Sequence, residues 1–251
     1  MIAKRVNGTQ HAPGDVAPVM GELVAAKLEA PCVRPGVVAR PRLIDALDAS
    51  GGVGVTVVGA PTGYGKTLLV AAWCADVVQR GAQAAAWLSL AATENDPGLL
   101  MRYLIGALRH AGLQVGERAA VMVRVAGASP FACMRSLLND LAGLPERATL
   151  VLDDYHVITE VVCHELIGLL VDHGDRVLRV IFCTRADPPL ALGSLRAGGQ
   201  LSEIGADDLR FSLDEAAQLL LRASDGLKLD RESVATLTAR TEGWPRLSRS
   251  S

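Results

Sequence analysis

The residues with the clearest chemistry form one run, Ala60-Pro61-Thr62-Gly63-Tyr64-Gly65-Lys66-Thr67. Glycines in such a run let successive backbone N–H groups turn inward around phosphate oxygens, and the N-terminus of a following helix adds its dipole. Lys66 is then placed to reach the β- and γ-phosphates of a nucleotide, while the hydroxyl of Thr67 ligates Mg²⁺. With the next residue, Leu68, this run is the predicted nucleotide-binding loop.

The surroundings of this run are those that a phosphate loop requires. An uncharged, β-branched stretch over residues 53–58 precedes it, and an apolar helical pattern over residues 67–80 follows it. One position departs from the usual pattern, because Ala60 stands where a first glycine is expected. We expect Gly59 to relieve the turn there.

Two acids end the next informative stretch, Leu150-Val151-Leu152-Asp153-Asp154. A strand parallel to the first would bring its carboxyl end to the same edge of the sheet as the loop. Asp153 would then hold Mg²⁺, and Asp154 would act as general base on the attacking water. The alternative is an ordinary strand end with two solvated aspartates; the loop upstream favours the magnesium site.

A third apolar stretch, over residues 180–183, ends in Thr184 and Arg185. Thr184 is a candidate for binding the attacking water. Arg185 is a candidate sensor of the γ-phosphate, because a guanidinium group matches phosphate oxygens. The residues alone leave a second possibility open, a surface arginine that pairs with Asp187. His156 follows the two acids, and a lone histidine in a loop more often has a structural role.

Alternating patterns define the elements that must position these residues. Strand patterns cover residues 53–58, 84–90, 149–152, 177–183 and 201–204. Helical patterns cover residues 67–80, 97–111, 130–142, 160–172, 212–223 and 230–241. Such alternation predicts an α/β fold, a three-layer P-loop domain with a mostly parallel central sheet. The last two helices have no strand between them, which predicts a small C-terminal helical lobe.

These patterns divide the chain into three parts. We expect residues 1–26 to be a poorly ordered leader, residues 27–205 to form the P-loop core, and residues 206–251 to begin a truncated helical lid. Within the core, Leu43, Ile44 and Leu47 share one face of a short helix. Ser212 and Glu215 have the spacing of a capping box at the start of the lid.

Composition narrows the class of protein further. Half of the 251 residues are hydrophobic and 21% are charged, which is typical of a chain with a sizeable buried core. A net charge of -2 gives no electrostatic reason to expect binding to nucleic acid or to an anionic membrane. We find no signal peptide and no apolar run long enough to span a bilayer. Five scattered cysteines without a CxxC pair favour buried, reduced thiols in a cytoplasmic protein.

Several further stretches carry a family resemblance: Lys27-Leu28, Val38-Ala39-Arg40, Ala86-Trp87-Leu88-Ser89-Leu90, Asn95-Asp96-Pro97, Leu152-Asp153-Asp154-Tyr155-His156, Leu209-Arg210-Phe211 and Gly243-Trp244-Pro245. Together with the loop, they resemble the N-terminal ATPase domain of MalT-like (large LuxR-type) transcriptional activators. Those activators belong to the signal-transduction ATPases with numerous domains, the STAND class. The resemblance covers about residues 27–245.

The resemblance implies roles that spacing alone does not give. Arg40 would lie near the nucleotide, and Pro245 would close over the adenine in an ADP-bound resting state. Asp154 and Arg185 match the catalytic-base and sensor positions, and Asp153 matches the magnesium position. In this family, ADP holds the protein inactive, ATP and an inducer open it and permit self-association, and hydrolysis resets it.

Chains of this family usually continue into sensor and DNA-binding domains. We therefore expect this chain to be a switch module that binds ATP or ADP with Mg²⁺, hydrolyses ATP slowly and does not bind DNA directly. Two alternatives stay open. One is a metabolic P-loop kinase or other small-molecule phosphotransferase, and the other is a nucleotide-binding interaction module without turnover.

Overall fold

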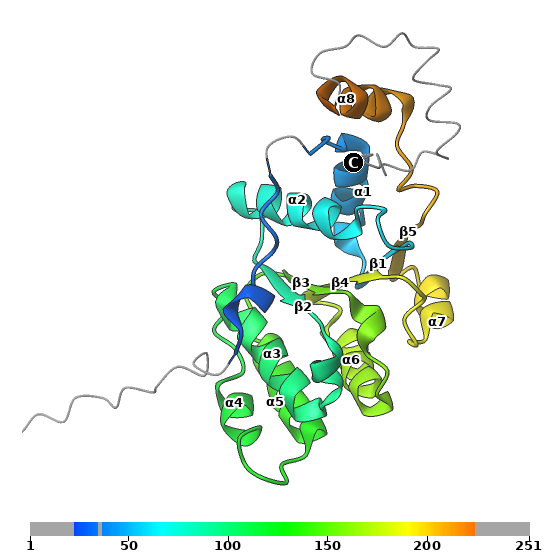
Figure 1. The fold of residues 1–251 in the computed structure, drawn as a ribbon. Coiled ribbons are helices and arrows are strands. Elements are labelled where there is room, and N and C mark those ends of the chain that lie inside the picture. The colour runs from blue at the N-terminus through cyan, green and yellow to red at the C-terminus, as the bar shows by residue number, and fades with distance from the viewer. Residues whose placement is uncertain (1–22, 35–36, 224–251) are drawn as a thin grey trace, which may run out of the picture.

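The computed structural model describes residues 23–34 and 37–223, which form three layers around a parallel sheet (Figure 1). The strand order is β2-β3-β4-β1-β5, and every neighbouring pair is parallel. The strands are β1 (Val55–Gly59), β2 (Ala85–Ser89), β3 (Ala148–Asp153), β4 (Leu178–Thr184) and β5 (Leu201–Ile204). The predicted α/β fold class is thereby confirmed.

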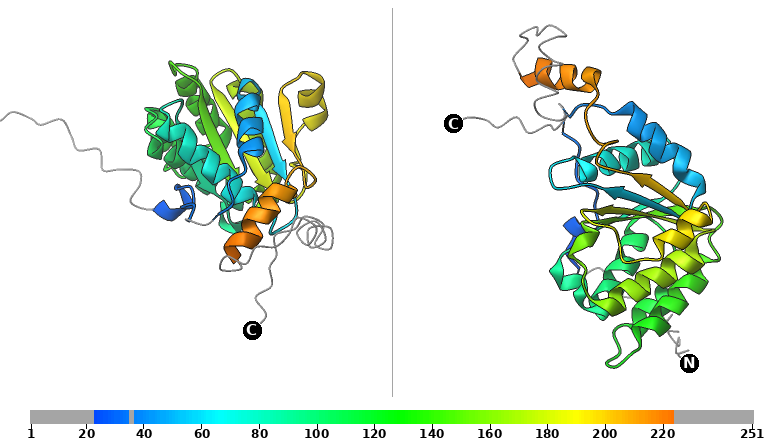
Figure 2. Two further views of the ribbon diagram at one scale, coloured as in Figure 1. Left: turned by 90° about the horizontal axis from the view of Figure 1, so that it is seen from above. Right: turned by 90° about the vertical axis from the view of Figure 1, so that its right-hand side faces the viewer.

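Helices cover both faces of the sheet, as Figures 1 and 2 show. On one face lie α1 (Pro41–Ala49) and α2 (Lys66–Gln79). On the other lie α3 (Pro97–His110), α4 (Glu117–Met122), α5 (Pro130–Leu141) and α6 (Val161–Gly174). At the β5 edge lies α7 (Leu192–Ala197), and α8 (Leu213–Ala223) lies beyond the body on the side of α1 and α2.

The core follows from the apolar strands. Every residue of β3 and β4 is buried, as expected for central strands covered on both faces. The larger hydrophobic cluster lies against α3, α5 and α6 and contains Leu104, Leu137 and Leu150. A smaller cluster under α1 and α2 contains Trp73 and Ile181. The two clusters pack the helices against the two faces of the sheet.

Helix starts follow the capping signals in the sequence. The side chain of Asp96 accepts a hydrogen bond from Leu99 N at 2.6 Å, and Pro97 occupies the first turn of α3. Ser212 and Glu215 form the predicted capping box, because Ser212 N donates to Glu215 Oε2 at 2.9 Å and Glu215 N donates to Ser212 Oγ at 3.2 Å. The capping box at the start of α8 is therefore confirmed.

Some expectations are corrected. The short helices α4 and α7 were not predicted. Cys32 is exposed rather than buried, whereas the other four cysteines are buried as expected. A 3-10 helix spans Ala25–Lys27, across the predicted boundary between leader and core. The predicted helix over residues 230–241 lies outside the described residues. Among the residues that are described, no helix is long and apolar enough to cross a membrane.

Candidate nucleotide site

The phosphate loop connects β1 to α2 at the carboxyl edge of the sheet. Gly63 and Gly65 have φ values of 90° and 78°, in the left-handed region that favours glycine, so these two glycines shape the turn. Ala60 is buried, and its amide donates to Thr184 O at 3.2 Å. Gly59 lies within β1 and has no positive φ. The expectation that Gly59 relieves the turn is therefore wrong.

Lys66 is the first residue of α2, and its side chain folds back over the loop. Its Nζ donates to Ala60 O at 2.7 Å and to Pro61 O at 3.0 Å. Burial lowers the pKa of Lys66 from its ordinary value, against the opposing influence of Asp154 and Asp153. The ammonium group is thus already held inside the loop, where phosphate oxygens are expected.

A direct contact joins the loop to the strand that carries the two acids. Thr67 Oγ1 donates to Asp153 Oδ1 at 3.0 Å, across a sequence separation of 86 residues. Asp153 is only 4% exposed, and its burial raises the pKa of its carboxyl group, while the hydrogen bond from Thr67 works in the opposite direction. The prediction that these two residues meet at the sheet edge is borne out by this contact.

This hydroxyl and carboxylate pair fits a magnesium ion. Mg²⁺ prefers oxygen ligands and is usually held by one or two protein oxygens together with water and phosphate. The described residues contain no group of three or more His, Cys, Asp or Glu side chains that could hold a metal by themselves. Thr67 and Asp153 are therefore the residues that would hold Mg²⁺ beside a bound nucleotide.

Asp154 follows immediately and has a different environment. Its side chain is 50% exposed, so it is open to solvent, and its backbone has a φ of 56°. It is the one non-glycine residue with positive φ among those described. Residues in this region cluster at functional sites, although Asp tolerates it better than most residue types. The backbone thus directs Asp154 away from the strand.

His156 lies close to Asp154, and whether its role is structural stays a prediction. Its Nδ1 is 3.8 Å from Asp154 Oδ1 and has no hydrogen-bond partner within the described part of the chain. Burial lowers the pKa of His156, and the nearby positive charges of Arg185 and Lys66 lower it further. His156 therefore belongs to the surroundings of the candidate site.

The strand β4 contributes Thr184 and Arg185. Thr184 is buried, and its hydroxyl donates to Ala186 O at 2.6 Å. Its proton is thus used inside its own loop, and a contact between Thr184 and an attacking water stays a prediction. Arg185 is exposed, and its charge lowers the pKa of both Lys66 and His156. Arg185 therefore lies near the loop, and its sensor role stays a prediction.

Arg40 lies at the junction with α8. Its Nη2 donates to Arg210 O at 2.7 Å and to Glu215 Oε2 at 3.2 Å, and its guanidinium group lies 4.6 Å from the centroid of the Phe211 ring. Burial lowers its pKa. Arg40 thus ties the start of α1 to α8 and to the residues just before it, rather than to the phosphate loop. Pro245, which the resemblance predicts to close over the adenine, lies outside the described residues.

Three features of the structure define its class. The sheet is parallel and has the strand order given above, a loop shaped by glycines precedes a helix, and a strand-end carboxylate lies beside that loop. These are the features of a P-loop NTPase fold. No protein-family model matches the chain. Among solved structures, the chain is similar to the STAND protein with a tetratricopeptide repeat sensor PH0952 from Pyrococcus horikoshii, with a TM-score of 0.56, 16% identity, and coverage of 88% of this chain and 30% of that one. It is also similar to Cdc6p from Pyrobaculum aerophilum, with a TM-score of 0.50, 17% identity, and coverage of 84% and 57%.

Curated relatives are similar in sequence as well. The chain is 33% identical to the HTH-type transcriptional regulator MalT of Yersinia enterocolitica over 88% of this chain and 24% of that protein. It is 34% identical to MalT of Serratia proteamaculans with the same coverage. It is 32% identical to the serine/threonine-protein kinase PknK of Mycobacterium tuberculosis over 94% of this chain and 21% of that protein. The chain therefore has a P-loop NTPase fold and is similar in sequence to MalT regulators, and it spans only 21–24% of the length of these curated relatives.

Sequence reasoning missed one residue that the structure connects to the site. Asn95 was noted only as part of a resembling stretch, without a role. Its side chain contacts the loop that follows the two acids, over a separation of more than 60 residues. The available signal was its position directly before the Asp96 cap, in the segment that follows the predicted second strand.

Proposed function

We propose that this chain is an ATP- and ADP-binding switch module of a MalT-like regulator and that it hydrolyses ATP slowly with Mg²⁺. The observation that carries the proposal is the 3.0 Å contact between Thr67 Oγ1 and Asp153 Oδ1. It supports the proposal because a hydroxyl from a phosphate loop and a strand-end carboxylate are the pair that positions a magnesium nucleotide in P-loop NTPases.

The residues divide the work of hydrolysis between them. Residues 60–68 bind the phosphates, with Lys66 exchanging its loop carbonyls for phosphate oxygens. Mg²⁺, when bound, supplies positive charge that stabilises the phosphate oxygens. Asp154 accepts a proton from water as the water oxygen bonds to the γ-phosphorus and the bond from phosphorus to the β–γ bridging oxygen breaks. Arg185 stabilises negative charge on the γ-phosphate.

The lid is the part of the molecule that would report the bound nucleotide. We propose residues 27–205 as the core and residues 206–251 as the beginning of the lid. Arg40 supports this division because it belongs to the segment before α1 and binds Arg210 and Glu215 of the lid. A nucleotide bound near this junction would stabilise one arrangement of core and lid over another, which is the requirement for a switch.

The test of nucleotide binding is direct. The wild type and Lys66→Ala are purified in parallel and denatured, and any released nucleotide is identified by chromatography. We expect ADP from the wild type alone, because Lys66→Ala removes the only cation of the loop. Arg109→Ala, a change on α3 away from the loop, is the matched control and should retain the nucleotide. Equal affinity of wild type and Lys66→Ala for ATP and ADP would overturn the proposal.

We also propose that the chain self-associates when ATP is bound. Sedimentation velocity with ATP analogue and with ADP should show larger species with the analogue only. A screen of phosphoryl acceptors distinguishes the switch from a small-molecule kinase, because sustained transfer to an acceptor would make the chain a phosphotransferase instead.

A further inference from the structure

The loop that carries the two acids continues as a 3-10 helix, η5 (Tyr155–Val157), and then runs to α6. The amide of Val157 donates to Asp154 O at 3.0 Å, which closes the turn directly after the candidate catalytic base. Tyr155 anchors the inner side of this turn, with its ring 4.8 Å from that of Phe182 and its hydroxyl 2.9 Å from His164 Nδ1. A different residue must hold the outer side of the turn in place.

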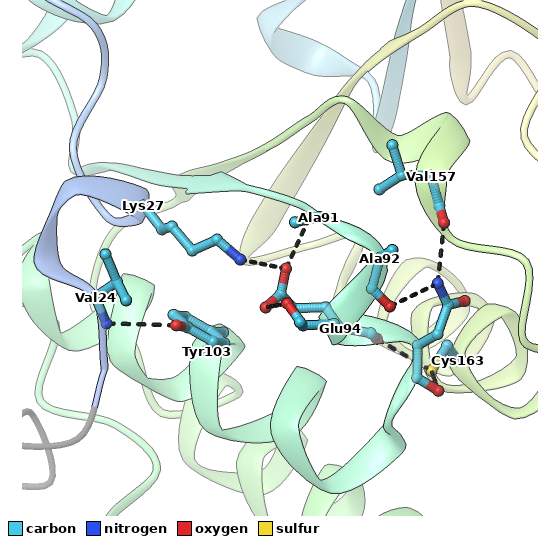
Figure 3. A network of polar contacts seen from close by, with 10 residues as sticks. Val24, Lys27, Ala91, Ala92, Glu94, Tyr103, Val157 and Cys163 are labelled. Atoms are coloured by element: carbon cyan, nitrogen blue, oxygen red, sulfur yellow. Dashed lines mark hydrogen bonds and ion pairs between the residues drawn. The ribbon is translucent and has the colours of Figure 1, made fainter.

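Asn95 provides that support with both ends of its amide. Its Nδ2 donates to Val157 O at 3.0 Å, and its Oδ1 accepts from Thr159 N at 2.7 Å and Glu160 N at 2.9 Å. The carbonyl of Val157 faces this amide in Figure 3. Val157 therefore links the two residues, because its carbonyl accepts from the Asn95 side chain and its amide donates to the carbonyl of Asp154.

The element that presents Asn95 is itself fixed. Asn95 ends the 3-10 helix η4 (Ala92–Asn95), and Nδ2 of Asn95 also donates to Ala92 O at 3.1 Å. The preceding residue, Glu94, is fully buried and accepts from Lys27 Nζ and from Ala91 N, as Figure 3 shows. Because a buried acid paired in this way resists movement, the Asn95 amide has a fixed place from which to hold the loop.

We propose that Asn95 is a positioning residue for hydrolysis: it holds the 157–160 segment and thereby keeps Asp154 in the left-handed conformation from which it meets the attacking water. This inference rests on the proposed ATPase function. Asn95 touches neither Thr67 nor Lys66, so nucleotide binding does not depend on it. Asn95 therefore affects the placement of Asp154 during ATP hydrolysis, the step that follows nucleotide binding.

The experiment compares four purified full-length chains: wild type, Asn95→Ala, Asn95→Asp and Asn139→Ala. Asn139 is an exposed residue of α5, so its replacement is a matched control. Each protein is measured for ATP affinity, for kcat and KM of Mg²⁺-dependent hydrolysis, and for hydrogen exchange of the amides of residues 157–160.

We expect Asn95→Ala to lower kcat about tenfold, since small misplacement of a catalytic group is costly, with KM for ATP unchanged within about twofold. The amides of Thr159 and Glu160 should exchange faster in this variant, because they lose their acceptor. Asn95→Asp keeps an acceptor but no donor for Val157 O, so it should protect these two amides and give a kcat between those of wild type and Asn95→Ala. Asn139→Ala should match the wild type in every measurement.

Either of two results would overturn the role of Asn95: unchanged kcat in Asn95→Ala, or loss of kcat and ATP affinity together in both Asn95 variants. If the wild type binds nucleotide but does not hydrolyse it, the ATPase part of the proposed function fails by itself. Hydrogen exchange then decides whether Asn95 holds the loop, and equal exchange in all four proteins would end the proposal.

Discussion

Two buried carboxylates, Asp153 at the phosphate loop and Glu215 at the lid junction, are held in opposite ways. Asp153 accepts a hydrogen bond from Thr67, and burial raises its pKa. Burial alone would also raise the pKa of Glu215, but the Ser212 amide and the guanidinium groups of Arg40 and Arg42 hold it below its ordinary value.

This difference separates a functional carboxylate from a structural one. Glu215 is stabilised in its charged form by groups of the protein itself, so the folded chain favours the ion pair that joins core to lid. Burial disfavours the charged form of Asp153. Such a perturbed pKa is typical of groups that interact with a ligand or reactant. The comparison predicts that Asp153 can be neutralised with a gain in stability and Glu215 only with a loss.

The largest expected effect concerns the neighbour of Asp153. Asp154→Asn should lower kcat for ATP hydrolysis about a hundredfold or more, the range for loss of a general base, and leave ATP affinity within about twofold. A phosphate-release assay and a binding titration on the same preparation measure both values. Asp187→Asn, an exposed change in the loop after β4, is the control. Undiminished hydrolysis in Asp154→Asn would instead favour the interpretation of a solvated strand end.

Glu215→Gln should release the lid. The change removes the charged partner of Arg40, whose side chain is only 9% exposed, and should cost about 3 kcal/mol, as expected for a broken buried pair. Hydrogen exchange across residues 207–220 and urea unfolding measure the loss. Glu203→Gln breaks the exposed pair with Arg196, which solvent screens, and should leave the stability nearly unchanged. Equal costs for the two variants would remove the distinction between Glu215 and a surface acid.

Asp153→Asn should stabilise the protein in the absence of nucleotide. The amide removes a buried charge and still accepts the hydrogen bond from Thr67, so we expect about 1 kcal/mol, or a Tm higher by about 2–4 °C. The same change should abolish the dependence of nucleotide affinity on Mg²⁺. Asp172→Asn, an exposed change on α6, should leave Tm within about 1 °C. A lower Tm in Asp153→Asn would show that its charge is stabilised by the fold after all.

The smallest effect is a difference in pH dependence. The lowered pKa of Glu215 means that its contribution to stability is present above its ordinary value of 4.5 and is lost as pH falls through the folded value. The raised pKa of Asp153 has the opposite effect on stability. Protonation of Asp153 stabilises the folded state as pH falls. Unfolding free energies on the acid side should therefore fall less steeply in Glu215→Gln than in wild type, and more steeply in Asp153→Asn. Parallel curves for all three proteins would contradict this account.

The sequence predicts the sheet and the phosphate side of the site well, because local signals and the fold agree there. Buried β-branched strands, the glycines at positions 63 and 65, and the proline at the start of α3 each determine local structure through their own chemistry. The contact of Thr67 with Asp153 then follows from parallel strands that end at one edge.

Contacts made by tertiary packing were not predicted. The Thr184 hydroxyl bonds within its own loop, and nothing in the residue type distinguishes this from a bond to water. The short helices α4 and α7 have six residues each, too few for a periodic pattern. The contacts of Asn95 join two loops that are more than 60 residues apart in the sequence, which no local pattern reveals.

The left-handed backbone at position 154 restricts which carboxylic acid can serve there. A longer or β-branched residue would carry a strain of about 1–2 kcal/mol in that conformation, whereas Asp and Asn are among the residue types that tolerate it. Glutamate would extend the reach of the base by one methylene group but would have to straighten the turn that Asn95 supports. The main-chain conformation therefore favours the shorter acid at this position. To place the carboxylate farther from the main chain, the loop would have to change together with the side chain.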